Sequence, residues 1–451
     1  MRPIRFLIKT GRRVHRANWL VRASAAALLF AWLPPILSQE VAMTSMQRGY
    51  IGVMLNDIKD DVKHYYYDPK FHGVDLDAQF KQAGEYLKTA VTFNQGMGIV
   101  AWTLRPLSDS HTFLIPPRRP VKVTYSYELQ MIGGNCFATA VEPEGDAEKA
   151  GLQVGMKILS VDAMAIGSMR FWEINYISRI LRPQPTDLLE VQSSGQASRT
   201  IGIPPRVTPV PRHMFLGEVY WDNVRHAQTR RRKLNPRSRT FGEGVIVWKM
   251  PVFLADERLI DDMLNQSGKY KAMIFDLRQN GGGAELALMR LLGGLFDHDV
   301  KVGERVTRKG TDALVAKPHG SPYKGRVFVL VDQRSASASE IFARVLQLTH
   351  RGLVIGDMTS GSVMEAKIYA HPFGRSNEDY FATEISQADL RMEDGISLEG
   401  IGVTPDQKML PNQKDLEKQR DPVLAYAVSL AGAQVTPEEA GKLFPIEWEK
   451  D

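Results

Sequence analysis

The sequence has a single cysteine, Cys136, among 451 residues. One cysteine can form neither an internal disulfide nor a zinc site built from several thiolates. An excess of one charge is also missing from most of the chain. The net charge is +6, but residues 1–22 contain seven cations and no acid, so the remainder sums to −1. The body of the protein therefore has no general attraction to polyanions.

Long apolar runs are absent as well. Hydrophobic residues make up 43% and charged residues 24% of the chain, which is typical of folded proteins and excludes a disordered chain, a collagen or a multi-span membrane protein. The cationic leader precedes an apolar stretch of 11 residues, 23–33, shorter than the roughly 20 residues of an ordinary membrane span. This pattern predicts a signal peptide over 1–39 and export to the periplasm or the outside; an uncleaved membrane anchor is the alternative.

The remaining chain divides by its patterning. Mixed three- and four-residue apolar steps predict helices before Pro116-Pro117, alternating residues such as 121–127 predict strands, and a proline-rich joint follows at 204–211. The last 40 residues are expected to be polar and helical. The predicted organisation is a leader, a helical region, a β-rich domain, a core and a helical tail, at 1–39, 40–120, 121–210, 211–411 and 412–451.

An arginine-rich stretch, residues 225–239, contains seven cations and no acid. A solvated loop is the ordinary interpretation of such a run. A docking patch for an anionic partner, whether nucleic acid or anionic lipid, is the weaker alternative. We expect no nucleic-acid partner.

Beyond residue 241 the pattern alternates between strand and helix. Strands are predicted at 244–249, 272–277 and 327–331, and helices at 257–264, 286–296 and 340–348. Such alternation implies right-handed crossovers and a largely parallel sheet. In sheets of this kind, functional sites gather at the carboxyl ends of the strands.

Two strand ends carry candidate chemistry. After the strand at 272–277, Gly281-Gly282-Gly283 would let backbone N–H groups approach a ligand, as an oxyanion hole requires, although a tight turn explains it equally. After the strand at 327–331, Ser337 stands at a helix start, where N–H groups would stabilise an oxyanion. Ser337-Ala-Ser-Glu340 also fits a capping box.

A third candidate is the loop Leu107-Ser-Asp-Ser-His-Thr112. A serine nucleophile needs a base that is neutral near pH 7, and His111 has the right chemistry. A histidine in a polar loop is otherwise most often a surface residue. The remaining histidines have no comparable setting.

In this order, the segments resemble the C-terminal processing (tail-specific) serine peptidases, and among them the tricorn-like branch. The resemblance covers roughly residues 55–410 and rests on six segments: 66–75, 107–112, 147–162 (similar to a PDZ core), 274–283, 335–340 and 398–406. It implies an α+β / α/β multidomain fold with an N-terminal helical region, a PDZ-like β domain and an α/β core of the ClpP/crotonase type.

The resemblance also implies roles for individual residues. Ser337 would be the nucleophile, and the N–H groups of Ala338 and of Gly281 or Gly282 would form the oxyanion hole. Ser362 stands where one branch of the family has a lysine base, and Lys367 lies five residues too late. The tricorn-like branch uses a Ser–His pair instead, which implies His111 as base with Ser110 in support. Glu399 would orient them, with Glu393 as the fallback.

We therefore expect an exported serine endopeptidase that acts on protein or peptide substrates, without a metal or other cofactor. The PDZ-like domain would bind a substrate's C-terminus or a strand, or would be a structural domain that only gates the cleft. The competing hypothesis is a protein that keeps the fold without activity and binds peptides or other ligands. Tethering through the leader and oligomer formation are left open by the sequence.

Overall fold

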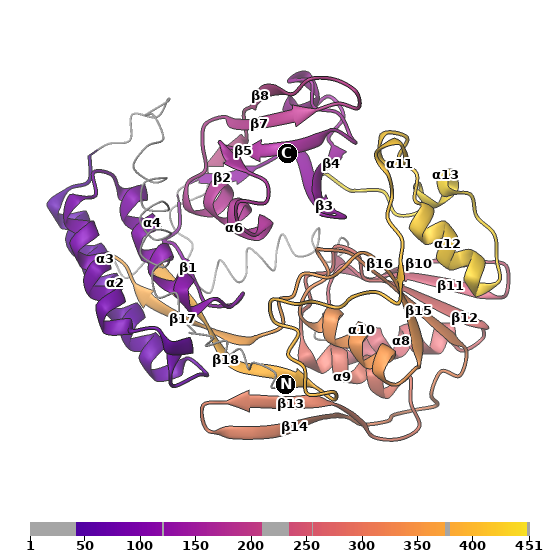
Figure 1. Ribbon diagram of the computed structural model, residues 1–451. Coiled ribbons are helices and arrows are strands. Elements are labelled where there is room, and N and C mark those ends of the chain that lie inside the picture. Colours follow the sequence, from indigo (N-terminus) through magenta and orange to yellow (C-terminus); the bar gives the residue numbers. More distant parts are fainter. Residues whose placement is uncertain (1–41, 120, 210–233, 255, 375–378, 449–451) are drawn as a thin grey trace, which may run out of the picture. The chain divides into compact units, whose positions relative to one another are not determined.

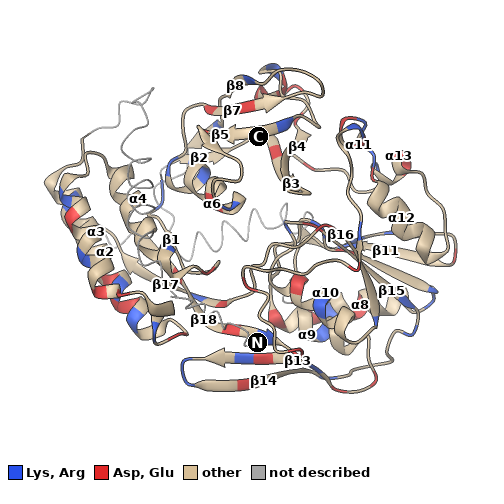
Figure 2. Cartoon of the chain, viewed as in Figure 1, with Lys and Arg blue, Asp and Glu red and all other residues tan. Residues whose placement is uncertain are grey.

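The computed structural model describes residues 42–119, 121–209, 234–254, 256–374 and 379–448 (Figure 1). The predicted leader and residues 225–233 of the arginine-rich stretch lie outside the described residues. Within the part that is described, none of the helices combines the length and the apolar character needed to cross a bilayer. Charges of both signs are interspersed over the described elements (Figure 2).

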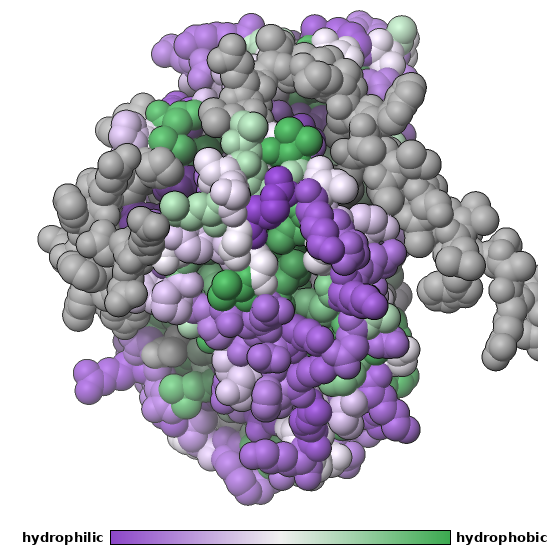
Figure 3. All heavy atoms as spheres, turned by 90° about the vertical axis from the view of Figure 1, so that its left-hand side faces the viewer, coloured by the Kyte–Doolittle hydropathy of each residue, from purple (hydrophilic) through white to green (hydrophobic). Residues whose placement is uncertain are grey.

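Three helices form the N-terminal region, as the sequence predicts: α2 (Ser45–Tyr65), α3 (Leu76–Thr89) and α4 (Phe93–Leu104). Each starts where a side-chain oxygen accepts a hydrogen bond from a first-turn amide, supplied by Thr44, Asp75 and Thr92. Their apolar sides share a core with two residues of a distant strand, Phe381 and Ile385. Hydrophilic residues cover much of the outward face of this region (Figure 3).

The β-rich module follows in the chain. Its main sheet has the order β3-β4-β5-β7-β8, with β6 paired to β5. The bounds are β3 (Tyr127–Ile132), β4 (Asn135–Val141), β5 (Lys157–Val161), β6 (Met164–Ala165), β7 (Asp187–Gln192) and β8 (Arg199–Ile203). Where the chain enters and leaves the module, β2 (Val121–Thr124) and β9 (Arg206–Pro209) pair as a separate two-stranded ribbon. The module also contains α5 (Asp146–Lys149), α6 (Phe171–Asn175) and a π-helical turn (Tyr176–Leu181).

Cys136 lies in the core of this module with no exposed surface. Burial raises the pKa of its thiol to about 12. A thiol that stays protonated at neutral pH is a packing group rather than a nucleophile. This agrees with a structural role for the only cysteine.

The core sheet confirms the predicted parallel arrangement. Its order is β10-β11-β12-β15-β16-β19, and all pairs are parallel except β10 with β11. The bounds are β10 (Arg237–Phe241), β11 (Val245–Lys249), β12 (Ala272–Asp276), β15 (Arg326–Val331), β16 (Gly352–Gly356) and β19 (Gln407–Lys408). Because alternate residues point to opposite faces, these apolar strands need a cover on both sides.

Helices α8 (Glu257–Ser267), α9 (Glu285–Gly293) and α10 (Ala338–Leu348) share the core on one face of this sheet. On the other face the cover is α12 (Pro422–Ala431), flanked by α11 (Gln413–Glu417) and α13 (Pro437–Ala440). The expectation of a polar tail is therefore wrong for α12. Its apolar residues are buried, because the second sheet face has to be removed from water.

A second, antiparallel sheet was not predicted. It contains β13 (Val300–Thr307), β14 (Gly310–Ala316), β17 (Glu365–Pro372) and β18 (Tyr380–Met392), together with β1 (Phe113–Ile115). Strand β1 comes directly after the histidine loop and pairs with β18, where Phe113 lies opposite Glu384. This pairing attaches the N-terminal region to the core and fixes the place of His111.

The β-rich module contacts the core sheet next to the carboxyl ends of the core strands. Gln130 of β3 donates to Asp332, which follows β15, and lies within 3.4 Å of Gln279 in the glycine-rich turn. Asp332 in turn accepts from the Gln279 amide. A side chain of the module thus takes part in the hydrogen bonds that hold the loop before Gly281.

An ionic cluster around the buried Asp276 fixes the start of this turn. Arg278 makes paired hydrogen bonds to Asp276, at the end of β12, and to Asp421, at the start of α12. Lys249 also contacts Asp276. Burial alone would raise the pKa of Asp276, but the charges of Arg278 and Lys249 outweigh it and hold that pKa well below its usual range.

We predict that Asp276→Asn lowers the free energy of unfolding at pH 7 by about 3–5 kcal/mol, because two partly buried cations lose the buried carboxylate that they share. A depressed carboxyl pKa contributes stability above the unfolded-state value, so the effect is fully present at neutral pH. Urea denaturation measures it. Glu85→Gln, which breaks the exposed pair with Lys88, is the control and should change stability by less than about 1 kcal/mol. Equal effects of the two variants would contradict the role assigned to the cluster.

Candidate active site

Ser337 lies at the junction between β15 and α10 in a strained backbone conformation, with φ 54° and ψ −121°. Its amide donates to the carbonyl oxygen of Ser362 at 2.7 Å and to Oε2 of Glu340 at 3.1 Å. The amide of Glu340 is bonded to the carbonyl oxygen of Ser337. The structure thus forms only the half of the capping box that Glu340 supplies, and the serine hydroxyl is not used as a cap.

The carboxylate of Glu340 is the anchor of this turn. It is fully buried and also accepts from Thr359 Oγ1 at 2.5 Å, from the Gly361 amide at 2.7 Å and from the Ser362 amide at 2.9 Å. Burial raises its pKa. These contacts fix residues 359–362 against Ser337, and an over-determined surrounding of this kind is what lets a strained serine persist.

The glycine-rich turn packs directly against Ser337. Gly282 has φ +100°, and a Cβ added to it would lie 2.6 Å from the Ser337 Cβ, so only glycine fits there. The Gly282 amide is already bonded to Oδ1 of Asn280 at 2.9 Å. Gly281 lines the cavity, which favours its N–H over that of Gly282 as an oxyanion donor. Ala338 begins α10, where first-turn amides lack partners inside the helix.

The histidine loop contacts Glu399, which comes from the C-terminal part of the core sequence. Ser110 Oγ lies 2.7 Å from His111 Nδ1 and 3.0 Å from Glu399 Oε2, and the Ser110 amide donates to Glu399 Oε1 at 2.8 Å. An ionised carboxylate only accepts, so the Ser110 hydroxyl donates its proton to Glu399. His111 Nδ1–H then donates to Ser110 Oγ, and Nε2 is left with a free lone pair.

Burial sets the electrostatics of this group. It lowers the pKa of His111, while the charge of Asp109 opposes that shift. Asp109 also holds the loop, since it accepts from the His111 amide and from the hydroxyls of Thr112 and Ser386. Burial raises the pKa of Glu399, against which the amides of Val363 and Ser110 act. The imidazole is therefore held neutral at physiological pH.

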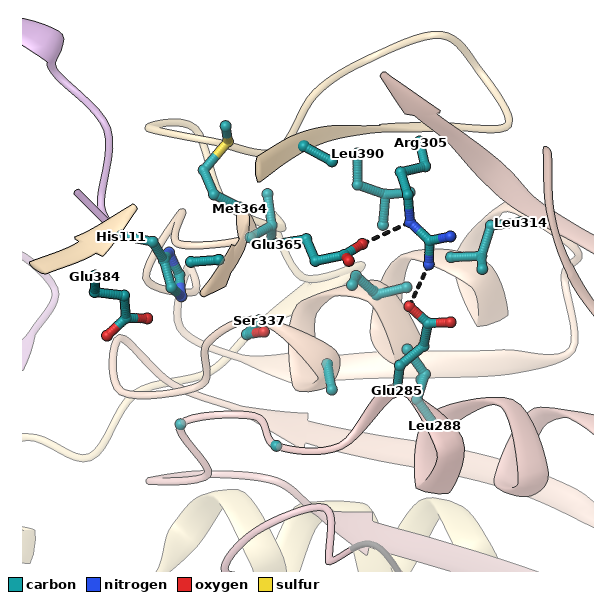
Figure 4. A pocket seen from close by; sticks show the side chains of 17 residues that line it. His111, Glu285, Leu288, Arg305, Leu314, Ser337, Met364, Glu365, Glu384 and Leu390 are labelled. Carbon is teal, nitrogen blue, oxygen red and sulfur yellow. Dashed lines mark hydrogen bonds and ion pairs between the residues drawn. The ribbon is translucent and has the colours of Figure 1, made fainter. Parts of the chain in front are cut away.

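His111 and Ser337 line the same cavity, which has a volume of about 390 Å³ (Figure 4). Their side chains lie on neighbouring walls, although 226 positions separate them in the chain. Gly281 and Ala338 line it as well. The structure thus brings together the serine, the histidine and both candidate oxyanion donors, with Ser110 and Glu399 behind the imidazole.

The other candidates lie elsewhere. Glu393, the fallback carboxylate, pairs with Lys301 and is about half exposed. Lys367 is exposed on β17. Ser362 has no basic side chain, and its carbonyl oxygen accepts a hydrogen bond from the Ser337 amide. Across the described residues, no three His, Cys, Asp or Glu side chains are grouped so as to hold a metal ion.

The sequence analysis missed four charged residues of the cavity, Glu285, Arg305, Glu365 and Glu384. Three of them lie on β13, β17 and β18, strands that it did not predict. Strand β17 is exposed at many positions and has no regular apolar pattern, so the sequence did not predict it as a strand. Strand β18 is buried at most positions without a regular alternation, so no sequence signal marked Glu384.

Residues 239–409 match the family model of peptidase family S41. The chain carries a peptidase family S41 domain. Relatives agree: the tail-specific protease of Haemophilus influenzae is 39% identical over 132 residues, 27% of this chain and 18% of the relative. The chloroplastic C-terminal processing peptidase of Tetradesmus obliquus is 24% identical over 383 residues, 78% of this chain and 75% of the relative. This chain thus spans less than a fifth of the first relative's length.

Solved structures show that the fold around the S41 domain is shared. Mature CPAF complexed with lactacystin has a TM-score of 0.62 at 14% identity, covering 86% of this chain and 98% of that one. The photosystem II D1 C-terminal processing protease has a TM-score of 0.51 at 18% identity, covering 88% and 100%. The mixed α/β multidomain fold expected from the sequence is confirmed. The tricorn-like branch and the PDZ character of the β-rich module stay predictions.

We predict that Gly282→Ala destabilises the S41 domain by about 1–3 kcal/mol, because the new methyl group overlaps the Ser337 side chain in a backbone conformation that disfavours it. Gly281→Ala is the matched control, since a Cβ there meets nothing within 4 Å. Chemical denaturation of both variants gives the comparison. If Gly281→Ala were the more damaging change, the close approach of Gly282 to Ser337 would be refuted.

Proposed function

We propose that this chain is an exported serine endopeptidase that cleaves peptide bonds through an acyl-enzyme, with Ser337 as nucleophile and His111 as base. The observation that supports this most is the cavity of the S41 domain, which both side chains line. The hydrogen-bonded series Glu399–Ser110–His111 supports it further, because it leaves the imidazole with a free lone pair at Nε2.

In the first step, His111 Nε2 takes the proton of Ser337 Oγ, and the oxygen attacks the carbonyl carbon of the substrate. The N–H groups of Gly281 and Ala338 would stabilise the oxyanion. The imidazolium that forms keeps its Nδ1–H bond to Ser110, whose hydroxyl proton stays directed at the Glu399 carboxylate. Ser110 therefore transmits the orienting effect of Glu399 without itself changing protonation.

In the second step, His111 donates its proton to the leaving amine, which departs with the C-terminal part of the substrate. Water then hydrolyses the acyl-enzyme with His111 again as base. General base catalysis typically contributes about 10²–10⁴-fold and a single oxyanion donor about 10²–10³-fold to the rate. Ser337 and His111 are thus expected to account for most of the activity.

Substrates would be proteins or peptides, as for the peptidases this chain resembles. The β-rich module is proposed to bind a substrate segment, and its Gln130 contact to Gln279 and Asp332 lies close to the oxyanion turn. Export rests on the cationic and apolar pattern of residues 1–39. Two curated relatives are named C-terminal or tail-specific peptidases, which is compatible with a substrate bound near its C-terminus.

The competing function is a peptide- or ligand-binding protein without activity. The presence of Ser362 where one branch of the family has a lysine base favours it. The Ser110–His111 pair argues against it, since it supplies a neutral base in the same cavity. A reagent that requires an activated serine separates the two hypotheses.

We predict that a fluorophosphonate labels the protein at Ser337, and that Ser337→Ala abolishes both labelling and peptidase activity while the fold is retained. Mass spectrometry of the labelled peptide identifies the residue, and circular dichroism verifies folding. Ser360→Ala is the control, because this neighbouring serine lies in the supporting loop outside the cavity lining. Full activity in Ser337→Ala would rule out the assigned nucleophile, and absence of labelling would favour the binding protein.

We further predict that kcat/KM rises with pH through a midpoint below 6.5, the ordinary histidine value, because burial lowers the pKa of His111. The protonated imidazole cannot act as base, so activity is lost on the acid side of this midpoint. A pH–rate profile of the wild-type enzyme measures it. An acid limb centred well above 6.5 would be inconsistent with His111 as the buried neutral base.

A further inference from the structure

The cavity around Ser337 is acidic. Its lining contains three glutamates, Glu285, Glu365 and Glu384, against one arginine, Arg305. Arg305 pairs with Glu285 and with Glu365, at 2.5 Å in each case. Two of the three carboxylates thereby share one guanidinium as their partner. Glu384 is the one that lies apart from this cluster, beside His111 (Figure 4).

Glu384 has a fixed position on the cavity wall. It belongs to β18, where Phe113 of β1 and Ile368 of β17 are its cross-strand neighbours. Ala388 and Leu390 of the same strand also line the cavity, and residues two apart on a strand share a face. The carboxylate is therefore held at the cavity by strands paired on both sides rather than by a loose loop.

Within the described part of the chain, the Glu384 carboxylate makes no hydrogen bond or ion pair, although the residue is only partly exposed. Burial and the charge of Asp109 both raise its pKa. A carboxylate in such a place is costly unless a donor or a cation is supplied. The charge of Asp109 opposes the lowering of the His111 pKa.

The place of Glu384 relative to His111 indicates which part of a substrate it would meet. In acyl transfer the histidine donates its proton to the leaving amine, so the segment that departs lies on the histidine side of the serine. Glu384 is on that side in Figure 4, whereas Arg305 and its two partners lie beyond Ser337. The two charged groups thus face different parts of a bound peptide.

We propose that Glu384 is a specificity determinant that receives a lysine or arginine side chain from the segment C-terminal to the scissile bond. This rests on the proposed peptidase function and on the assignment of His111 as base. The cation would satisfy a carboxylate that has no partner in the protein, and an acidic residue at the same place would be repelled. Charge-assisted hydrogen bonds of this kind are among the stronger polar contacts.

The test uses three otherwise identical peptides with lysine, alanine or glutamate at the first position after the cleaved bond, and a second set varied one position further on. We expect lysine to exceed glutamate in kcat/KM by about tenfold or more in one of the two sets. Glu384→Gln should reduce that ratio to within about threefold, and Glu384→Lys should invert it. Glu393→Gln, an exposed carboxylate away from the cavity, should leave the ratio unchanged.

Binding to Ser337→Ala, measured by fluorescence anisotropy with the same peptides, separates this inference from the peptidase assignment. If the wild type were neither labelled nor active, the proposed function would be wrong. A preference for the lysine peptide in binding to Ser337→Ala, abolished in the double variant Ser337→Ala/Glu384→Gln, would still support the role of Glu384. Equal binding and equal cleavage of the lysine and glutamate peptides would overturn the inference. So would a preference that survives in Glu384→Gln.

Discussion

The buried carboxylate of Glu340 is the interaction on which the candidate site depends. One side chain accepts from the amide of Ser337 and from three donors of residues 359–362, and so ties the start of α10 to a loop that follows β16. A serine with positive φ is costly, and the cost is met by this set of contacts and by the close packing of Gly282. The same contacts explain why Glu340 follows the serine at a spacing that also suits a capping box.

The position of His111 depends on strand pairing rather than on the turn around Ser337. The histidine loop belongs to the N-terminal region. The short β1–β18 ladder, the Ser110–Glu399 hydrogen bonds and the bonds of Asp109 and Thr112 to Ser386 connect it to the core near Ser337. Phe381 and Ile385 of β18 lie in the core of the N-terminal helices, so the packing of that region and the position of His111 are coupled. His111, the proposed base, is thus positioned by tertiary contacts of an element that is distant from Ser337 in the sequence.

A mechanism with the proposed Ser110–His111 pair, and without a lysine base, is coherent in this setting. Ser362 keeps the backbone contact to Ser337, while Glu399 and Ser110 orient the imidazole from behind. Burial keeps that imidazole neutral. The proposed mechanism therefore needs no basic group at position 362.

The sequence by itself determined the parallel core, because apolar strands such as 272–276 and 327–331 alternate with amphipathic helices. Local motifs also made Ser337, His111 and the glycine turn candidates for the site. It did not reveal the antiparallel sheet, in which β14 and β17 are exposed at many positions and lack such a pattern. It did not reveal the burial of α12 either. The hydrogen bonds of Glu399 to Ser110, the engagement of the Gly282 amide and the place of Glu384 were decided by tertiary structure. Each depends on which distant side chains meet across strands, and spacing along the chain does not encode that.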